Sequence, residues 1–383
     1  MTSVAVVGGG PAGCACAALL ARESDVVIFE EHPRAGVPEH CAGLLTDGAI
    51  SLTGVSPGIL STLYGAEAVL PDGRRIVIRS DSPKARTVDR AELDSLMADR
   101  AVSAGAEYRT SDRVDSFSVF DDRVDVTARR TGTSSFDLLI GADGNASKVS
   151  SSLGGNRAPE YLRGMQADVA GTTTMHDDLF TVRLGSRYAP GFFAWEIPCG
   201  DFTRVGLCIP DSMGAPWPYL SRLLSDLNVE SRVLRRSCGR IPVGRRRTMT
   251  SDRIMLVGDA ASHVKPVSAG GVYPSMRAAP ILCEVASSAL ADGDLSAGRL
   301  ASYDRMFRRS MGRELDRGWK LRRQFVRMDD AALNRAGAFA SRPDVVSALN
   351  GLDLDDPVAV LGDMLRRPGV AVRGLYTLMR CLL

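Results

Sequence analysis

Residues 4–30 read VAVVGGGPAGCACAALLARESDVVIFE, and this stretch decides the fold. The β-branched run at residues 4–7 predicts a strand, and the small apolar residues 14–22 predict a helix. A second strand is predicted at residues 26–29. Between the first strand and the helix stand the glycines of a GxGxxG pattern, which are Gly8, Gly10 and Gly13. This order of strand, glycine turn, helix and strand is typical of the α/β fold that binds dinucleotides.

Each glycine of the pattern has a physical reason to be glycine. Gly8 permits the tight turn, Gly10 lets the backbone approach a pyrophosphate, and Gly13 lets the helix pack closely on the strand. The phosphates then lie at the positive amino terminus of the helix. Glu30 ends the second strand, where a carboxylate accepts hydrogen bonds from a ribose. The alternative is a glycine-rich turn of purely structural use, but the spacing of all these parts favours a dinucleotide site.

Length and composition restrict the class of protein. The chain has 383 residues, of which 45% are hydrophobic and 24% charged, as in ordinary soluble domains. Its formal net charge of +2 argues against a dedicated nucleic-acid partner. The sequence contains no run of about 18 apolar residues, so we expect no membrane-spanning helix. A strand at residues 4–7 leaves no room for a signal peptide, so we expect a cytoplasmic protein.

The cysteines and histidines predict free thiols and no metal site. No two cysteines form a CxxC pair, and the chain has only 4 histidines. The cysteines are Cys14, Cys16, Cys41, Cys199, Cys208, Cys238, Cys283 and Cys381.

Two later motifs repeat the pattern of a strand that ends in an aspartate beside a glycine. Residues 137–147 read DLLIGADGNAS and carry Asp143-Gly144. Residues 253–261 read RIMLVGDAA and carry Gly258-Asp259. Pro266 follows, and then Gly270-Gly271 opens a predicted helix. Such aspartates can bond the hydroxyls of a ribitol or ribose, and the two glycines can offer N–H groups to a phosphate or a ring edge.

In this order, the motifs resemble those of the flavoprotein monooxygenase superfamily typified by para-hydroxybenzoate hydroxylase, whose members bind FAD. The resemblance covers residues 4 to about 280 and implies that FAD is the cofactor. It implies that the glycine loop and Glu30 hold the ADP half, that Asp259 contacts the ribitol and pyrophosphate, and that Gly270 and Gly271 lie near the flavin. The hydroxylases have an arginine after Ser-x-Val of the central motif, but here Ser150 follows Val149.

Three further segments resemble the geranylgeranyl reductase family. They are HCAGLL at residues 40–45, RTVDR at 86–90 followed by Leu93-Asp94, and PGFFAWEIP at 190–198. Members of the family share a Cys-x-Gly segment near the flavin and an aromatic-x-Trp-x-x-Pro motif in the substrate domain. Their substrates are long isoprenoid chains of archaeal ether lipids or chlorophyll precursors. This chain departs from the family at Ala269, which takes the place of the first of three glycines.

The resemblance implies a set of site residues. The catalytic candidates are Cys41, His40 and Tyr273. The candidates for substrate contact are Phe192, Phe193, Trp195 and Pro198. The candidates for FAD binding are Gly8, Gly10, Ala12, Gly13, Glu30, Glu31, Cys41, Ala42, Gly43, Arg90, Asp143, Gly144, Gly258, Asp259, Pro266, Gly270 and Gly271. The predicted function is reduction of the double bonds of geranylgeranyl chains by hydride transfer from reduced flavin.

Several alternatives stay open. The chain could be a hydroxylase or an epoxidase, or a flavin carrier without turnover. A halogenase is disfavoured, since the first Trp of its Trp-x-Trp-x-Ile-Pro motif is missing and residues 31–83 contain no lysine. Each candidate also has a purely structural interpretation. Without the resemblance, Trp195 could be a core aromatic, Cys41 a small buried side chain, and His40 a partly exposed loop residue. Two electron donors stay open, NADPH and a ferredoxin-like protein, because the sequence shows no second nucleotide fingerprint that would bind NADPH.

We therefore expect an α/β protein with a Rossmann-like FAD-binding domain, an antiparallel-sheet (α+β) substrate domain and carboxy-terminal helices. The FAD domain is assigned to residues 1–85, 86–154 and 246–298, the substrate domain to 155–245, and the helical region to 299–383. Apolar residues recur every four positions from Tyr303 to Trp319. Residues 300–383 hold 15 basic and 10 acidic residues, a net charge of +5. This basic helical face predicts either a solvated surface or peripheral contact with the inner face of the cell membrane.

Overall fold

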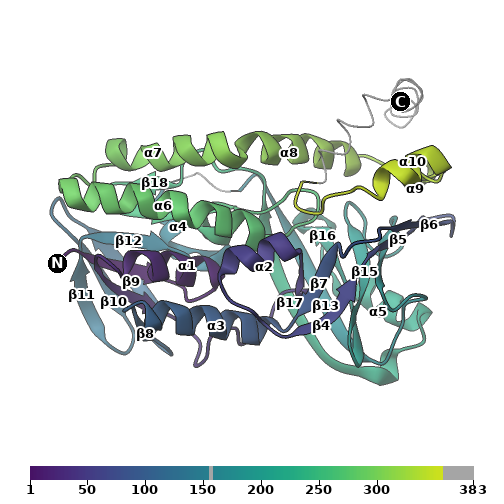
Figure 1. Ribbon diagram of the computed structural model, residues 1–383, viewed down its shortest axis with the longest axis horizontal. Coiled ribbons are helices and arrows are strands. Elements are labelled where there is room, and N and C mark those ends of the chain that lie inside the picture. The colour runs from purple at the N-terminus through teal and green to yellow at the C-terminus, as the bar shows by residue number, and fades with distance from the viewer. Residues whose placement is uncertain (155–157, 357–383) are drawn as a thin grey trace.

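The computed structural model describes residues 1–154 and 158–356, and Figure 1 shows its two larger sheets side by side. The first sheet has the strand order β18 (Thr250–Ser251), β19 (Ile254–Leu256), β12 (Leu138–Gly141), β1 (Ser3–Val7), β2 (Asp25–Phe29) and β8 (Glu107–Arg109). Strand β1 pairs in parallel with β12 and β2, and β12 pairs in parallel with β19. The three motif strands β1, β12 and β19 are thus neighbours, and their carboxyl ends meet at one edge of the sheet.

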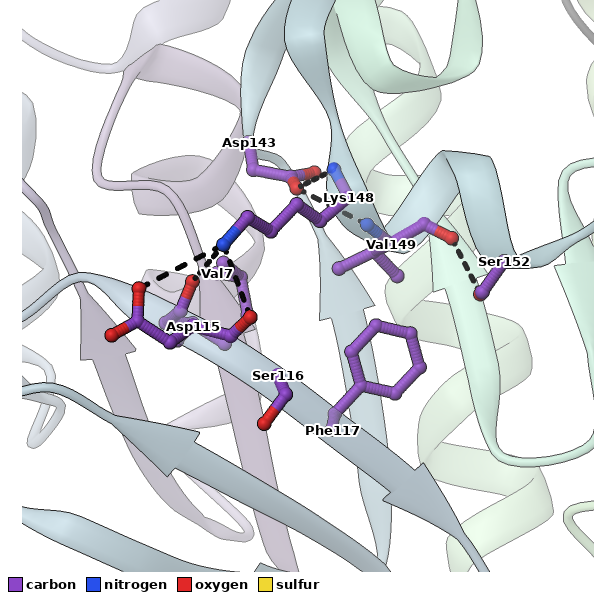
Figure 2. A pocket seen from close by; sticks show the side chains of 9 residues that line it. Val7, Asp115, Ser116, Phe117, Asp143, Lys148, Val149 and Ser152 are labelled. Atoms are coloured by element: carbon purple, nitrogen blue, oxygen red, sulfur yellow. Dashed lines mark hydrogen bonds and ion pairs between the residues drawn. The ribbon is translucent and has the colours of Figure 1, made fainter.

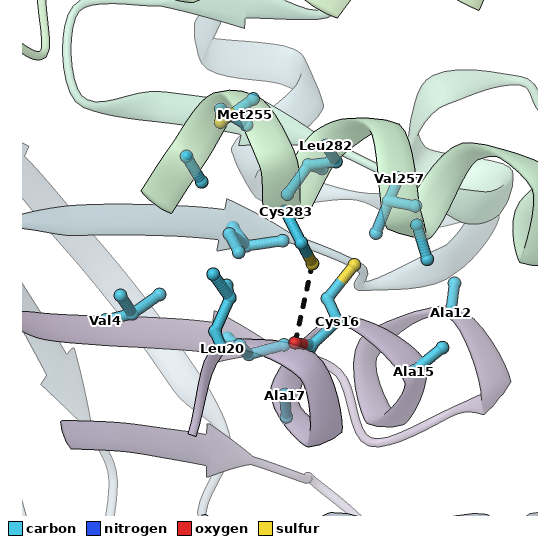
Figure 3. Packing of buried hydrophobic residues seen from close by; sticks show 14 of the residues in the cluster. Val4, Ala12, Ala15, Cys16, Ala17, Leu20, Met255, Val257, Leu282 and Cys283 are labelled. Atoms are coloured by element: carbon cyan, nitrogen blue, oxygen red, sulfur yellow. Dashed lines mark hydrogen bonds between the residues drawn. The ribbon is translucent and has the colours of Figure 1, made fainter. Parts of the chain in front are cut away.

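Small side chains let the helices pack closely on one another. Helix α1 (Pro11–Leu20) buries its alanines and cysteines against α6 (Val272–Asp292), as Figure 3 shows. There the Cys283 thiol donates to the carbonyl of Cys16 over 3.6 Å. Helix α3 (Arg90–Ser103) packs on the other side of α1. Because these side chains are small, α1 packs closely between α3 and α6 and places the glycine turn at the sheet edge.

The second sheet has seven strands in the order β17 (Val233–Val243), β13 (Glu160–Ala170), β16 (Phe202–Pro210), β15 (Phe193–Cys199), β14 (Leu179–Leu184), β5 (Gly65–Val69) and β6 (Arg75–Arg79). It is antiparallel except where β14 pairs in parallel with β5. Residues 65–79 therefore extend this sheet, although the sequence analysis assigned them to the FAD domain. The boundary proposed at residues 154–155 adjoins residues 155–157, which lie outside the described part of the chain.

Two small sheets and three short helices complete the body. The sheets have the orders β11-β10-β9 and β3-β7-β4. Their strands are β11 (Gly132–Phe136), β10 (Val124–Ala128), β9 (Val114–Val119), β3 (Leu44–Leu45), β7 (Ala85–Val88) and β4 (Ile59–Leu63). The helices are α2 (Asp47–Thr53), α4 (Lys148–Ser152) and α5 (Trp217–Asp226).

The carboxy-terminal region is helical as far as the structure describes it. Helix α7 (Ala297–Phe307) continues through a π-helical turn, Arg308–Gly312, into α8 (Arg313–Phe325), and α9 (Asp330–Ala340) and α10 (Pro343–Leu349) follow. Of the predicted stripe, Tyr303, Phe307, Met311 and Leu315 are buried and Trp319 is partly buried. Within the described residues no helix is long and apolar enough to cross a membrane. Residues 357–383 of the predicted helical region, with Cys381, lie outside that description.

Candidate flavin and substrate site

The glycine loop between β1 and α1 has the geometry of a phosphate cradle. Gly8 has φ +102°, and a Cβ there would overlap the carbonyl oxygen of Ala142. A Cβ on Gly13 would likewise overlap the Gly8 carbonyl. A Cβ on Gly10 would meet nothing within 4 Å, and no side chain caps the amino terminus of α1 there. The space beside Gly10 is therefore open, and the amino terminus of α1 has no side-chain cap, as a pyrophosphate site requires.

Glu30 is fixed beside this loop. Its Oε2 accepts a hydrogen bond of 2.8 Å from the Gly9 amide, and its Oε1 accepts one of 2.8 Å from the His32 amide. The Tyr108 hydroxyl donates to the Gly9 carbonyl over 3.0 Å. Glu31 is exposed and lies 3.7 Å from Arg113, so its side chain does not join Glu30 at the loop. Sequence reasoning missed Tyr108 and His32, because nothing local relates them to the glycines.

The central motif serves the turn that it occupies. The Asp143 carboxylate accepts hydrogen bonds from the Ser147 hydroxyl and from the amides of Lys148 (2.8 Å) and Val149 (3.3 Å). Burial raises the pKa of Asp143, although these hydrogen bonds oppose the shift. The Asp143 side chain thus binds the first two amides of helix α4, whose N-cap is Ser147, and the next residue, Gly144, has φ +72°. The sequence identified the position correctly as a turn, but here the carboxylate is already engaged by the protein.

A cavity of about 280 Å³ lies beside this turn (Figure 2). Val7 and Asp143 line it, but no glycine of the GxGxxG pattern does. The Lys148 ammonium group is held there by the carbonyl of Asp115 at 3.0 Å. The cavity therefore borders the dinucleotide loop without being part of its phosphate cradle.

The third motif meets the glycine loop from the other side. A Cβ on Gly258 (φ +70°) would lie 2.9 Å from the Ala12 Cβ, and one on Gly271 would lie 3.0 Å from Asp259 Oδ1. Asp259 thus lies between the first turn of α1 and the start of α6. Burial raises the pKa of Asp259 to about 6, and attraction to the Arg90 guanidinium partly opposes this. Such a carboxylate is suited to bonding the hydroxyls of a cofactor.

A buried histidine shapes this motif. The Gly258 amide donates to Nδ1 of His263 over 3.2 Å, and Nε2 of the same ring lies 3.1 Å from the Met249 sulfur. Burial lowers the pKa of His263 to about 3, so the ring is neutral at pH 7. Its role is therefore to hold the loop. Pro266 is also buried, and it packs on Gly318 of α8.

Arg90 joins the FAD-binding candidates to the catalytic ones. The buried guanidinium donates to Asp94 over 2.8 Å and also forms a hydrogen bond with the Cys41 sulfur. Burial lowers the pKa of Arg90, but the interactions with Cys41 and Asp94 outweigh it and leave that pKa raised. Cys41 is partly buried, and its sulfur accepts from the Gly43 amide over 3.5 Å. Arg90 thus pairs with Asp94 and lies near enough to Cys41 and Asp259 for their charges to interact.

The other two catalytic candidates lie in different surroundings. His40 is exposed, next to Gly239 of β17. Tyr273 lies in the first turn of α6, and its hydroxyl accepts a hydrogen bond of 3.0 Å from Arg277. The Lys265 ammonium group lies 5.7 Å from the Tyr273 ring centroid and donates to Asp355 over 3.0 Å. Only Cys41 of the three contacts Arg90 among the described residues.

The predicted substrate aromatics form a cluster. Phe192 is 2% exposed and stacks on Phe193 with ring centroids 4.2 Å apart, and the Phe193 ring meets Trp195 edge to face at 6.2 Å. Ala269 and Trp319 pack against the same cluster. The aromatic side chains therefore adjoin the loop that carries Gly270 and Gly271.

Two predicted positions differ in detail from their expected role. Pro198 is buried, and its carbonyl accepts from the Thr87 hydroxyl over 3.0 Å, so it joins β15 to β7 as part of the wall. Ala269 has φ +58°, the left-handed conformation that glycine adopts without strain. The backbone therefore keeps the glycine-like path at Ala269 despite its methyl group.

Comparisons with known proteins agree with this geometry. The family described as FAD binding domain matches residues 1–210. A digeranylgeranylglycerophospholipid reductase of Methanothrix thermoacetophila is 30% identical over 353 residues, covering 87% of this chain and 89% of that protein. Digeranylgeranylglycerophospholipid reductase 2 of Methanothermobacter thermautotrophicus is 30% identical over 347 residues, covering 86% and 89%. A geranylgeranyl bacteriochlorophyll reductase-like structure from Thermoplasma acidophilum has a TM-score of 0.81 at 20% identity, covering 95% and 99%, and shows the same fold.

Proposed function

This chain belongs to the FAD-binding domain family, and we propose that it is an FAD-dependent oxidoreductase that reduces C=C bonds of geranylgeranyl chains. The relatives' names support a lipid carrier for those chains, of the type of the archaeal ether-lipid precursors. The observation that carries the proposal is that the aromatic side chains and the loop before Gly270-Gly271 border one buried apolar cluster. Phe193, Trp195 and Ala269, the residue that precedes Gly270-Gly271, all pack against the same buried cluster, which contains Phe192.

The chemistry divides between cofactor and protein. When bound, FAD supplies the hydride that reduces the alkene. The protein aligns the isoprenoid against the aromatic side chains and excludes water, because an isolated alkene has no carbonyl that a side chain could polarise. Cys41 is the candidate for the proton donor, because the neighbouring Arg90 guanidinium would stabilise the thiolate that remains after the proton is given up. The reaction adds one hydride and one proton across each double bond.

The test is a mass measurement on the product. Holoenzyme reduced anaerobically with dithionite is mixed with a geranylgeranyl-bearing glycerophospholipid, and we expect a gain of two hydrogens per double bond. A product that gains one oxygen in air instead identifies a hydroxylase or epoxidase and overturns the proposal. NADPH and a reduced ferredoxin-like protein are compared in parallel arms, and the donor is the one that sustains turnover.

We propose that the protein meets its lipid at a membrane surface through the outer face of α7 and α8. Eight basic side chains of this face are exposed, and none forms an ion pair with another described residue. They are Arg305, Arg308, Arg309, Arg313, Arg317, Lys320, Arg323 and Arg327. The inner face of α8 covers the aromatic cluster, with the Arg322 guanidinium 5.2 Å from the Phe192 ring centroid. The basic face thus lies directly outside the candidate isoprenoid site.

Vesicle binding tests this location. At low salt we expect sedimentation with anionic vesicles and not with neutral ones, and loss of it in the triple variant Arg313→Glu, Arg317→Glu, Lys320→Glu. A control triple with the same charge change elsewhere, Arg22→Glu, Arg222→Glu, Arg236→Glu, keeps binding. Equal binding to both vesicle types, or equal loss in both triples, contradicts membrane contact through this face.

A further inference from the structure

The loop that carries Cys41 lies on the face of the second sheet. A Cβ on Gly239 of β17 would lie 3.8 Å from the His40 Cβ, so the absent side chain leaves room for the loop. Gly43 has φ +71°, and a Cβ there would lie 2.6 Å from the Val88 carbonyl and 3.1 Å from Nη1 of Arg204. The backbone of residues 40–43 therefore lies in direct contact with both β7 and the sheet.

Two side chains of the sheet bind the backbone of this loop. Gln166 Nε2 on β13 donates to the Cys41 carbonyl over 3.0 Å. Arg204 Nη1 on β16 donates to the same carbonyl over 3.2 Å and to the Ala42 carbonyl over 3.0 Å. Three donor contacts thus converge on the two peptide units that carry and follow Cys41.

Arg204 is itself held rigidly. Its side chain is 2% exposed and forms a two-point contact with Asp168, at 2.8 Å and 3.2 Å. Glu39, which precedes the loop, lies 3.0 Å from the Arg204 guanidinium, and Arg235 pairs with both carboxylates. Two arginines therefore balance two carboxylates, which is the arrangement that a buried charge requires. The guanidinium can change its position only by breaking this network.

Gln166 connects the loop to the aromatic cluster. The register places Gln166, Gly206 and Trp195 opposite one another on β13, β16 and β15. A Cβ on Gly206 would lie 2.6 Å from both the Gln166 Cβ and the Trp195 ring, so these two side chains meet over the glycine. Trp195 and Gln166 thus lie on the same face of the sheet, and Gln166 binds the Cys41 carbonyl there.

We infer that Gln166 and Arg204 are positioning residues that fix the Cys41 thiol relative to the flavin site and the aromatic cluster. Within the loop they bind only backbone carbonyls, and they act through Cys41. The role in turnover rests on the proposed function, but the positioning itself can be measured without any isoprenoid. The reactivity of the thiol toward a small alkylating agent reports the freedom of the loop directly.

The experiment compares Gln166→Leu and Arg204→Lys with the wild-type holoenzyme. The rate of Cys41 alkylation by iodoacetamide is followed by mass spectrometry of its peptide, and the exposed Cys238 of β17 serves as an internal standard. Loss of one hydrogen bond should raise the Cys41 rate about three- to tenfold, with the Cys238 rate unchanged. Arg240→Gln, on the same sheet but paired with Asp211, is the matched control and leaves both rates unchanged.

Turnover provides the second reading. If the chain is the proposed reductase, Gln166→Leu lowers kcat with little change in KM for the lipid, and Gln166→Asn, which keeps an amide donor, restores part of it. Unchanged Cys41 alkylation in both Gln166→Leu and Arg204→Lys overturns the inference, as does an equal change in Arg240→Gln. A shift in alkylation without any reductase activity supports the positioning role and contradicts the proposed function alone. Should Gln166→Leu fail to fold, Gln166→Met tests the same contact.

Discussion

The substitution Gly10→Ala distinguishes two roles of the glycine loop, which are binding of the FAD pyrophosphate and a purely structural turn. In the structure a Cβ at Gly10 meets nothing within 4 Å, and the backbone has φ −75°, which alanine adopts freely. The apoprotein should therefore lose about 1 kcal/mol of stability or less, the ordinary cost of alanine before a helix. With FAD bound, the same methyl group projects into the space that the pyrophosphate needs.

The expected loss of FAD affinity follows from that overlap. Overpacking by one methyl group costs about 1–3 kcal/mol, and since 1.4 kcal/mol is a factor of ten, the Kd for FAD rises about 5- to 150-fold. Flavin fluorescence during titration of the apoprotein measures the affinity, and thermal unfolding of the apoprotein measures the stability. Gly298→Ala in α7 is the control, with the affinity for FAD unchanged and the stability of the apoprotein unchanged or slightly raised. An unchanged affinity for FAD, or an apoprotein destabilised by more than about 2 kcal/mol, would refute the assignment of Gly10 to the cradle.

Three other variants test the site. The pKa of Asp259 is raised to about 6, so the folded apoprotein binds this proton more tightly than the unfolded chain does. The stability of the apoprotein should therefore fall as the pH rises from about 4 to about 6. Urea unfolding across this range should show a smaller decline in Asp259→Asn than in the wild type. Ala269→Gly relieves a left-handed alanine and should raise apoprotein stability by about 1 kcal/mol, measured by thermal unfolding; a fall in stability contradicts the strain. Trp195→Ala should raise KM for a geranylgeranyl lipid at least tenfold while FAD titration gives an unchanged Kd; a weakened Kd alone would place Trp195 at the cofactor instead.

The parts of the fold and of the site that could be predicted from sequence are those whose residues lie within one short segment. The glycine loop and Glu30 lie within residues 4–30, and the structure places them together as expected. The strand predicted before Asp259 is also present, as β19, which pairs in parallel with β12.

The parts that it missed depend on tertiary pairing. Gln166 and Arg204 contact Cys41 across 125 and 163 residues of sequence, and no local pattern relates them. Strands β5 and β6 join the second sheet through a parallel pairing with β14 that their sequence does not encode. Glu31 was predicted with Glu30 to bind FAD, yet its exposed side chain lies near Arg113, because successive residues at a strand end point in opposite directions.

Anaerobic stopped-flow spectroscopy of the reduced holoenzyme tests the central claim most directly. On mixing with a geranylgeranyl glycerophospholipid, the flavin absorbance near 450 nm should return without oxygen, with one double bond saturated for each flavin oxidised. Flavin that stays reduced until oxygen is admitted, with no saturated lipid formed, would contradict alkene reduction by this protein.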